Sequence, residues 1–381
     1  MAECKYYKLV RQVSYDSGVT WISLDEYQKG DLYENDSPDC GGGITQYRWV
    51  NVSGEYTCLG TTKYQKTKKQ QSTDGGQTWT DVNPPEYNTG SVIAYNSPDC
   101  VASSVKFSAA YNNGQSYSLE CNSSAVLSQS DTKPSGYDKT KMTSAIIGNC
   151  VTSIGDYALG GFESLTSVTI PNTVTSIGYM SFTLCDKLTS ITIPSGVTSI
   201  GDDAFGVCSG LTSVTFAQNS QLRIISANCF VDCDNLRSIT IPNGVTTIGL
   251  NAFWGCDKLT DVNIPNTVTT IGADAFGYCR VLSGVTIPSG VTVIGDYTFQ
   301  RCNALKTITF PSGTTSIGHG ALYYCTSLNR ITCLATTPPT LDETAFYNTN
   351  NAPIYVPSQS VNAYKSASGW SNYSSRIRAI S

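Results

Sequence analysis

The chain has 381 residues, a formal net charge of −5, and 14% charged against 40% hydrophobic residues. This length exceeds one ordinary compact core unless a repeat lets the core grow, and the hydrophobic content excludes an intrinsically disordered protein. The negative charge gives no electrostatic footprint for nucleic acid, and no apolar run approaches the roughly 20 residues of a membrane-spanning helix. The opening residues Met1 to Lys5 lack the apolar stretch of a signal peptide, so the sequence leaves the export route open.

A duplicated pattern occupies the front of the chain. Two copies of S-x-D-x-G-x-T-W occur there, and a Ser-Pro-Asp-Cys tetrad follows each copy. The pattern predicts a β-hairpin in which the Asp side chain accepts backbone N–H groups, Gly takes a positive φ and Trp packs beneath. We therefore predict two small β modules, residues 1–53 and 54–105. Their structural residues are expected to be Asp16, Gly18, Trp21, Asp74, Gly76 and Trp79.

This pattern resembles the Asp box of sialidase-type propellers, where the box is a structural staple remote from catalysis. A sialidase would also need a complete propeller and a cluster of arginines for the substrate carboxylate. Residues 1–105, with two boxes, supply neither. A glycosidase-related enzyme is therefore the least favoured of the functions considered.

The next segment, residues 106–146, is predicted to be a β bridge. Residues 105–109 and 115–120 have the composition of paired strands around Asn112-Asn113-Gly114. We expect this hairpin to form an N-terminal cap that shields the first coil of the repeats.

The sequence from Ile147 onward repeats the pattern I-P-x-x-V-T-x-I-G-x-x-A-F-x-x-C-x-x-L-T-x-V-x. The period is 23 residues, as from Ile170 to Ile193. One copy is two residues longer, and the loop 217–220 is expected to absorb the insertion. Such a period predicts a solenoid, here over residues 147–346.

Each repeat predicts a strand, a corner and a turn. Apolar and polar residues alternate up to Ile170, as in a strand with one buried face. Pro171 ends the strand because proline has no N–H group, and Gly178 permits a tight corner. Phe182 and Cys185 share one side of a helical turn. The fold class is therefore mainly β with short helical turns: a right-handed leucine-rich-repeat solenoid with one continuous parallel sheet, preceded by small β-hairpin modules.

The I-P steps, I-G corners, A-F pairs such as Ala204-Phe205 and repeat cysteines resemble the leucine-rich repeats of BspA-like (treponemal-type) surface antigens. The resemblance covers about residues 143–381. It departs at Phe162, which stands at a cysteine position, and at Cys229, which stands at an alanine position. It implies a bacterial surface or secreted protein that binds host, glycan or neighbouring-cell partners.

The end of the chain, residues 347–381, resembles the C-terminal cap of that family. A short helix is expected there, with Val361 and Tyr364 on one face. Gly369 should end the helix and Trp370 should pack beside it. Such a cap covers the apolar surface that the last coil would otherwise expose.

Fifteen cysteines are present, and seven recur once per repeat. Stacked coils would align these seven as inward-facing free thiols, because parallel Cβ directions do not suit a disulfide and a straight row does not converge on a metal. They are Cys185, Cys208, Cys233, Cys256, Cys279, Cys302 and Cys325. The candidates for disulfides are Cys4, Cys40, Cys58, Cys100, Cys121 and Cys150.

The single histidine, His319, lies between two glycines at a variable corner, where solvent exposure is expected. A Ser-His-Asp or Cys-His mechanism would have to use it. Its expected neighbours in adjacent coils, Asp296 and Ala273, include no nucleophile. We therefore predict no catalytic residue, no metal and no cofactor.

Strand alternation points a row of polar side chains outward, here named the sheet face. Its candidate binding residues are Ser190, Thr192, Ser213, Thr215, Ser238, Thr240, Asp261, Asn263 and Thr286. Further outward residues are Ser167, Thr169, Thr307, Thr309, Arg330 and Thr332. Beside this face, Trp254, Tyr278 and Tyr297 are predicted as exposed aromatic residues on a flank near the corner. Sugars stack on such rings and proteins anchor on them.

The leading interpretation is a non-catalytic binding or adhesion scaffold for a protein or glycan partner, at the cell surface or secreted. One alternative is a structural part of a surface or phage fibre. Another is that the Ser/Thr face only solubilises the sheet and binds no ligand. The oligomeric state stays open.

Overall fold

The structure of the chain is a computed structural model. It describes the backbone of residues 11–14, 21–24, 46–59, 62–72, 80–81 and 87–94, and both backbone and side chains of residues 105–121 and 125–380. The chain divides into two compact units, 1–101 and 102–381. The finer division into two front modules, a bridge, a solenoid and a cap stays a prediction.

The first unit contains antiparallel strands. Strand β1 (Arg11–Ser14) pairs with β2 (Trp21–Leu24), and β3 (Gln46–Leu59), β5 (Thr80–Asp81) and β6 (Tyr87–Ala94) each pair with β4 (Thr62–Ser72). Both S-x-D-x-G-x-T-W strings connect paired strands, one between β1 and β2 and one between β4 and β5. Five predicted Asp-box residues and the side chain of Trp21 lie outside the described part, so the staple stays a prediction. These five are Asp16, Gly18, Asp74, Gly76 and Trp79.

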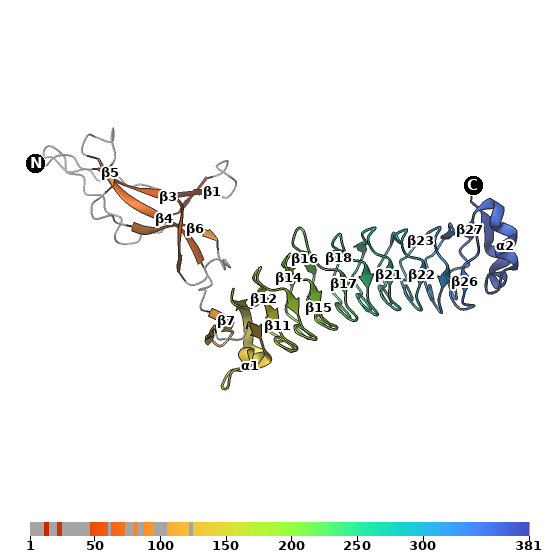
Figure 1. Cartoon of the computed structure of the whole chain (residues 1–381), viewed down its shortest axis with the longest axis horizontal. Helices are drawn as coiled ribbons and strands as arrows, with labels where there is room; N and C mark the ends of the chain where they lie inside the picture. The colour runs from red at the N-terminus through yellow and green to blue at the C-terminus, as the bar shows by residue number, and fades with distance from the viewer. Residues whose placement is uncertain are drawn as a thin grey trace, which may run out of the picture. The chain divides into compact units, whose positions relative to one another are not determined.

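The second unit begins with the predicted hairpin. Strands β7 (Val105–Tyr111) and β8 (Ser116–Glu120) pair around a turn in which Gly114 has a φ of 83°. Strand β7 also pairs antiparallel with β10 (Met142–Ile147), which lies parallel to β12 (Ser167–Thr169) of the first full coil. The hairpin thus covers the start of the solenoid, as Figure 1 shows. Between β8 and β10 lie β9 (Val126–Leu127), helix α1 (Gln129–Thr132) and the 3-10 helix η3 (Lys139–Lys141).

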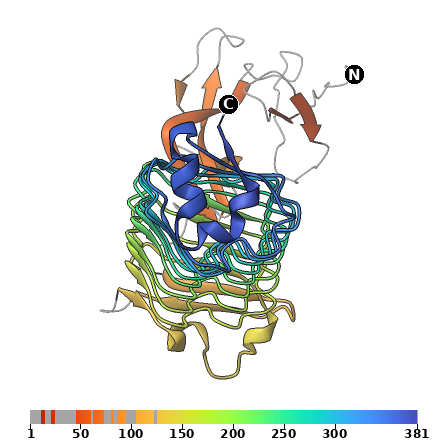
Figure 2. The same cartoon turned by 90° about the vertical axis from the view of Figure 1, so that its right-hand side faces the viewer.

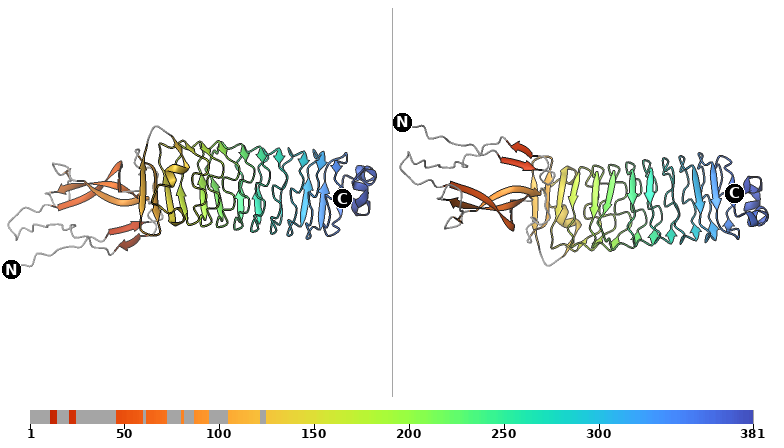
Figure 3. Two further views of the ribbon diagram at one scale, coloured as in Figure 1. Left: turned by 90° about the horizontal axis from the view of Figure 1, so that it is seen from below. Right: turned by 90° about the horizontal axis from the view of Figure 1, so that it is seen from above.

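The predicted strands form a first strand row along the stacked coils (Figure 3). After β12 the row contains β14 (Ser190–Ile193), β16 (Ser213–Phe216), β18 (Ser238–Thr240), β20 (Asp261–Asn263), β23 (Thr307–Phe310) and β25 (Arg330–Cys333). The prediction of one continuous sheet is wrong, because the row divides between β12 and β14 and again between β20 and β23. At the second break Gly284 replaces the usual Ser or Thr, and glycine weakens a strand.

A second strand row, which the sequence did not predict, precedes the I-G corners. Its two-residue strands are β9, β11 (Ser153–Ile154), β13 (Ser176–Ile177), β15 (Ser199–Ile200), β17 (Ile224–Ile225), β19 (Thr247–Ile248), β21 (Thr270–Ile271), β22 (Val293–Ile294), β24 (Ser316–Ile317) and β26 (Thr340–Leu341). The corner glycines are needed because neighbouring coils approach closely here. A Cβ on Gly201 would lie 2.5 Å from the backbone nitrogen of Tyr179.

The A-F segments form β-turns, so the predicted helical turn is wrong. In the fifth coil Trp254 N–H donates to Asn251 O over 3.0 Å, and Asn251 has a left-handed φ of 52°. Backbone groups bond to the next coil instead of along a helix, for example Phe253 N–H to Ala275 O over 2.9 Å. These inter-coil bonds compete with helix formation and link one coil to the next.

The solenoid interior is filled by stacked phenylalanines and cysteines. Six consecutive Phe rings lie 5.1 to 5.6 Å apart with planes within 8° of parallel. They are Phe182, Phe205, Phe230, Phe253, Phe276 and Phe299. Figure 2 shows the backbone of the stacked coils viewed along the solenoid. The mainly β solenoid predicted from the repeat is confirmed.

The C-terminal segment covers the last coil (Figures 1 and 2). It contains β27 (Ile354–Val356), the 3-10 helix η4 (Ser358–Ser360), α2 (Val361–Ser366), the 3-10 helix η5 (Trp370–Arg376) and β28 (Ile377–Ala379). As predicted, Trp370 packs beside the helix, against the buried Tyr364, but α2 ends at Ser366 with Ala367 as its C-cap and not at Gly369. The indole Nε1 of Trp370 donates to Pro339 O over 2.7 Å. Among the described residues, no helix is long and apolar enough to cross a membrane.

Candidate functional site

The structure places the predicted residues of the sheet face on one exposed surface. All nine candidate residues from Ser190 to Thr286 are exposed, while Ile191 and Val214 between them point into the core. Parallel pairing sets Ser190 beside Ser213 and Ser238 beside Asp261. Hydroxyl groups therefore line this surface, and the carboxylate of Asp261 and the amide of Asn263 in β20 are the exceptions.

The ends of the sheet face differ from the prediction. Thr332 is buried: it pairs with Tyr355 of β27, and the Nε of Arg330 lies 3.3 Å from its Oγ1. Arg330 also covers the ring of Tyr355 at 3.9 Å. At the other end, the break between β12 and β14 leaves a shallow hollow of about 290 Å³. Ser167, Val168, Thr169, Ile170, Ser190 and Thr192 line it.

The predicted aromatic residues lie half-buried on the turn side of the coils, here named the turn flank. The rings of Trp254 and Tyr278 contact each other with centroids 5.0 Å apart. Tyr297, also half-buried, contacts the His319 ring edge-on at 4.9 Å. These rings therefore pack against their neighbours along the flank and do not stand free in solvent.

Sequence reasoning missed a larger cluster on the turn flank. Arg301 lies between the rings of Tyr278 and Tyr324, and Tyr323 stacks on Tyr347 with centroids 5.2 Å apart. Residues 278, 301 and 324 are separated by the 23-residue period. Aligning the variable turn positions by that period would have revealed this row.

His319 is exposed at its corner, as predicted, but it has partners that the sequence did not predict. Its Nδ1 lies 3.1 Å from Asp342 Oδ1 and 2.9 Å from Thr344 Oγ1. A hydroxyl-activating triad needs the carboxylate and the hydroxyl on opposite ring nitrogens, whereas both are on Nδ1 here. Thr344 also hydrogen-bonds to Asp342, and these bonds hold the pKa of the Asp342 carboxyl below its usual value. The arrangement ties two coils together.

The seven repeat thiols are buried and unpaired, as the repeat predicted. Each Sγ donates to a carbonyl oxygen of the preceding coil, as Cys208 does to Phe182 O over 3.1 Å. Burial raises the pKa of the Cys233, Cys256 and Cys302 thiols, so that they stay protonated and unreactive. Within residues 105–121 and 125–380, no three His, Cys, Asp or Glu side chains converge as a metal site.

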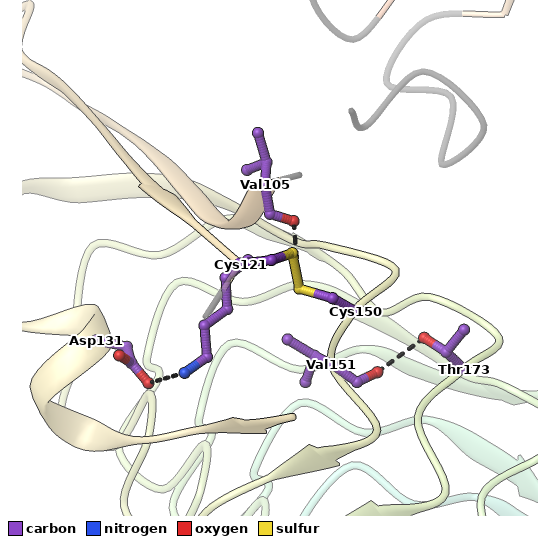
Figure 4. Close-up of a disulfide and its surroundings, with 7 residues drawn as sticks. Val105, Cys121, Asp131, Cys150, Val151 and Thr173 are labelled. Atoms are coloured by element: carbon purple, nitrogen blue, oxygen red, sulfur yellow. Dashed lines mark hydrogen bonds and ion pairs between the residues drawn. A yellow bond between two sulfur atoms is a disulfide. The ribbon is translucent and has the colours of Figure 1, made fainter. Parts of the chain in front are cut away.

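The N-terminal cap contains a disulfide and a buried ion pair (Figure 4). Cys121, after β8, is bonded to Cys150 in the first coil; both were candidates for pairing. The other four candidates lie outside the part whose side chains are described. Lys106, with 2% of its side chain exposed, contacts Asp131 of α1 over 2.9 Å. The disulfide therefore joins the cap covalently to the first coil, and the ion pair holds β7 and α1 together within the cap.

A family model described as "BspA type Leucine rich repeat region" matches residues 132–260 and 246–368. A leucine-rich repeat protein from Bacteroides ovatus is 20% identical with a TM-score of 0.40, over 72% of this chain and 90% of that one. The leucine-rich repeat protein of T. pallidum is 19% identical with a TM-score of 0.34, over 56% and 73%. A leucine-rich cell surface protein from Faecalibacterium prausnitzii is 22% identical with a TM-score of 0.31, over 85% and 98%. No curated protein matches this chain.

Proposed function

Because the chain belongs to the BspA-type leucine-rich-repeat family, we propose that it is a non-catalytic binding or adhesion scaffold for a protein or glycan partner. The observation that carries the proposal is the exposed sheet face on rigidly stacked coils. Its side chains repeat at the spacing of neighbouring strands, and such extended surfaces are what solenoids use to bind partners.

A location at the cell surface or outside the cell fits the thiol chemistry. The Cys121–Cys150 disulfide is of the kind that persists in oxidising compartments. The nine free cysteines among residues 125–380 are all buried, so an oxidising medium does not reach them. The pattern of one bonded pair in the cap and inaccessible thiols in the coils supports export.

The proposal is tested with an array of glycans and host proteins probed with the full chain. The double variant Asp261→Ala/Asn263→Ala should weaken a partner that binds the sheet face. The pair Trp254→Ala and Tyr278→Ala should weaken a partner that binds the turn flank. Each double variant serves as the control for the other, because they alter different sides of the same coils.

A ligand whose binding neither pair changes would place the site in the first unit and leave the solenoid as a stalk. A full chain that binds nothing on the array but assembles with itself or with fibre proteins would contradict the proposal. That second outcome would favour a structural role.

A further inference from the structure

Three consecutive coils place Tyr278, Arg301 and Tyr324 in one row. The backbone N–H of Tyr278 donates to Gln300 O over 2.8 Å, and that of Arg301 donates to Tyr323 O over 2.7 Å, which fixes the spacing. The Arg301 Cζ lies 5.4 Å from the centre of the Tyr278 ring and 4.9 Å from that of Tyr324. The guanidinium is therefore covered by an aromatic ring on each side.

The row is held by a backbone conformation that glycine adopts more easily. Tyr278, Arg301 and Tyr324 have φ values of 59°, 55° and 60°. The same turn position in the fifth coil is Gly255, with a φ of 74°. Large side chains occupy these three left-handed positions despite the steric cost, and together they form the cation–π row.

The charge of Arg301 has no acidic partner within ion-pair distance among the residues whose side chains are described. The neighbouring Arg280 differs, because its charge is paired within the fold. Its Nη1 donates to both oxygens of the Asp257 carboxylate, over 2.9 and 2.7 Å. With its two faces shielded by rings, the half-buried Arg301 keeps the donors at its edge for an external group. A planar fork of N–H donors fits a carboxylate.

We propose that the Tyr278–Arg301–Tyr324 row binds a sugar that carries a carboxylate; this inference rests on the proposed scaffold function. One unpaired guanidinium on a chain of net charge −5 suits a single carboxylate and repels a polyanion. Beside the row, Tyr347 is 54% exposed and stacks with Tyr323, which offers a ring surface for the apolar face of a sugar. A carboxylated sugar supplies the planar anion and the stacking face in one residue.

The test compares the binding of carboxylated and neutral glycans to the full chain by calorimetry. The probes are 3′-sialyllactose against lactose, and galacturonate against its methyl ester. At least one acidic probe should bind, and its neutral counterpart should bind at least about tenfold more weakly, since charge-assisted hydrogen bonds are lost. Arg301→Lys keeps the charge but not the fork, and should weaken binding by about the same factor. Arg237→Gln, which removes an exposed charge beside β18, should leave binding unchanged.

Several results would overturn the inference. They are equal binding of acidic and neutral probes, unchanged binding in a folded Arg301→Lys, no binding of either acidic probe, or tighter binding of a Glu-rich peptide at Arg301. The scaffold function would survive these results if the array yields a ligand that depends on Asp261 and Asn263. It would fail together with this inference only if the array yields no ligand at all.

Discussion

The thiol of Cys256 donates a hydrogen bond to the carbonyl oxygen of Phe230 in the preceding coil, over 3.2 Å. Five other repeat cysteines make the same bond to a phenylalanine, and Cys185 makes it to Leu159. Each cysteine thus fills the interior as a small apolar side chain and also satisfies a carbonyl of its neighbour. The repeat cysteine is therefore a link between coils.

This bond predicts that the seven repeat thiols resist alkylation in the folded protein. Mass spectrometry should find them unlabelled until denaturant is added, because all seven are buried out of reach of the reagent, and burial also raises the pKa of Cys233, Cys256 and Cys302. Cys256→Ala should lower the free energy of unfolding by about 1–2 kcal/mol. Disulfide-linked peptides from neighbouring coils would contradict this prediction.

The Lys106–Asp131 pair should make the N-terminal cap sensitive to acid. Partial burial raises the pKa of Asp131, but hydrogen bonds from Ser128 and Lys106 outweigh it and leave this pKa below its ordinary value of 3.8. The carboxylate therefore stabilises the fold fully above that value, and this contribution is lost as the pH falls through the lower folded pKa. Urea unfolding from about pH 6 to about pH 2 should show the loss, and Asp131→Asn should lack this component.

Replacing Lys106 tests the same pair at neutral pH. Lys106→Met should cost about 3 kcal/mol, because the mostly buried Asp131 carboxylate would lose its counter-charge. The exposed ion pair of Lys141 and Asp138 is the matched control, and Lys141→Met should change stability by less than about 1 kcal/mol. Equal effects of the two substitutions would show that burial does not strengthen the first pair.

The Cys121–Cys150 disulfide closes a loop with a sequence separation of 29. The double variant Cys121→Ser/Cys150→Ser should lower the free energy of unfolding by about 3–4 kcal/mol, since the unfolded chain gains entropy. A reducing agent should destabilise the cap and the first coil of the natural protein similarly, and should not destabilise them further in the variant. Hydrogen exchange should locate the loss in the cap and the first coil, with later coils still protected.

Substitutions of two glycines in the solenoid are predicted to have opposite effects on stability. Gly201→Ala should destabilise the protein by about 1–3 kcal/mol, because its Cβ would lie 2.5 Å from the backbone nitrogen of Tyr179. Gly284→Thr should stabilise it by about 0.5–1 kcal/mol, because nothing lies within 4 Å of its Cβ and a Thr favours the missing strand. Thermal unfolding measures both, and a destabilising Gly284→Thr would refute the explanation of the sheet break.

The sequence predicts those features that recur with the repeat. Apolar positions such as Ile191 and Phe205, and the cysteines, follow the 23-residue period, so their burial could be foreseen. The helical turn was wrong because the spacing of Phe182 and Cys185 fits a helix and a stacked turn equally well. Only the neighbouring coil, which supplies the inter-coil hydrogen bonds, separates the two.

Interactions that occur only once could not be predicted from the sequence, for a different reason. Lys106 and Asp131 come from a cap hairpin and a four-residue helix that the period does not relate, so nothing in the sequence pairs them. On the sheet face, alternation predicted the exposure of Asp261 and Asn263. It could not predict that Arg330 covers Thr332, because this depends on a side-chain conformation near the end of the row.

The two extra residues of the long repeat lie in the loop between β16 and β17, as predicted. Phe216 and Ile225 are nine residues apart, whereas Ile193 and Ile200 in the coil before are seven apart. The second strand row divides here between β15 and β17, but the first row continues from β16 to β18, and the rings of Phe205 and Phe230 still stack with centroids 5.5 Å apart. Gln218 at the tip of this loop is exposed. A coil can thus change its length at this corner while the ring stack of the interior continues. The corner is a natural acceptor for a foreign peptide, and the solenoid could display an epitope there without being redesigned.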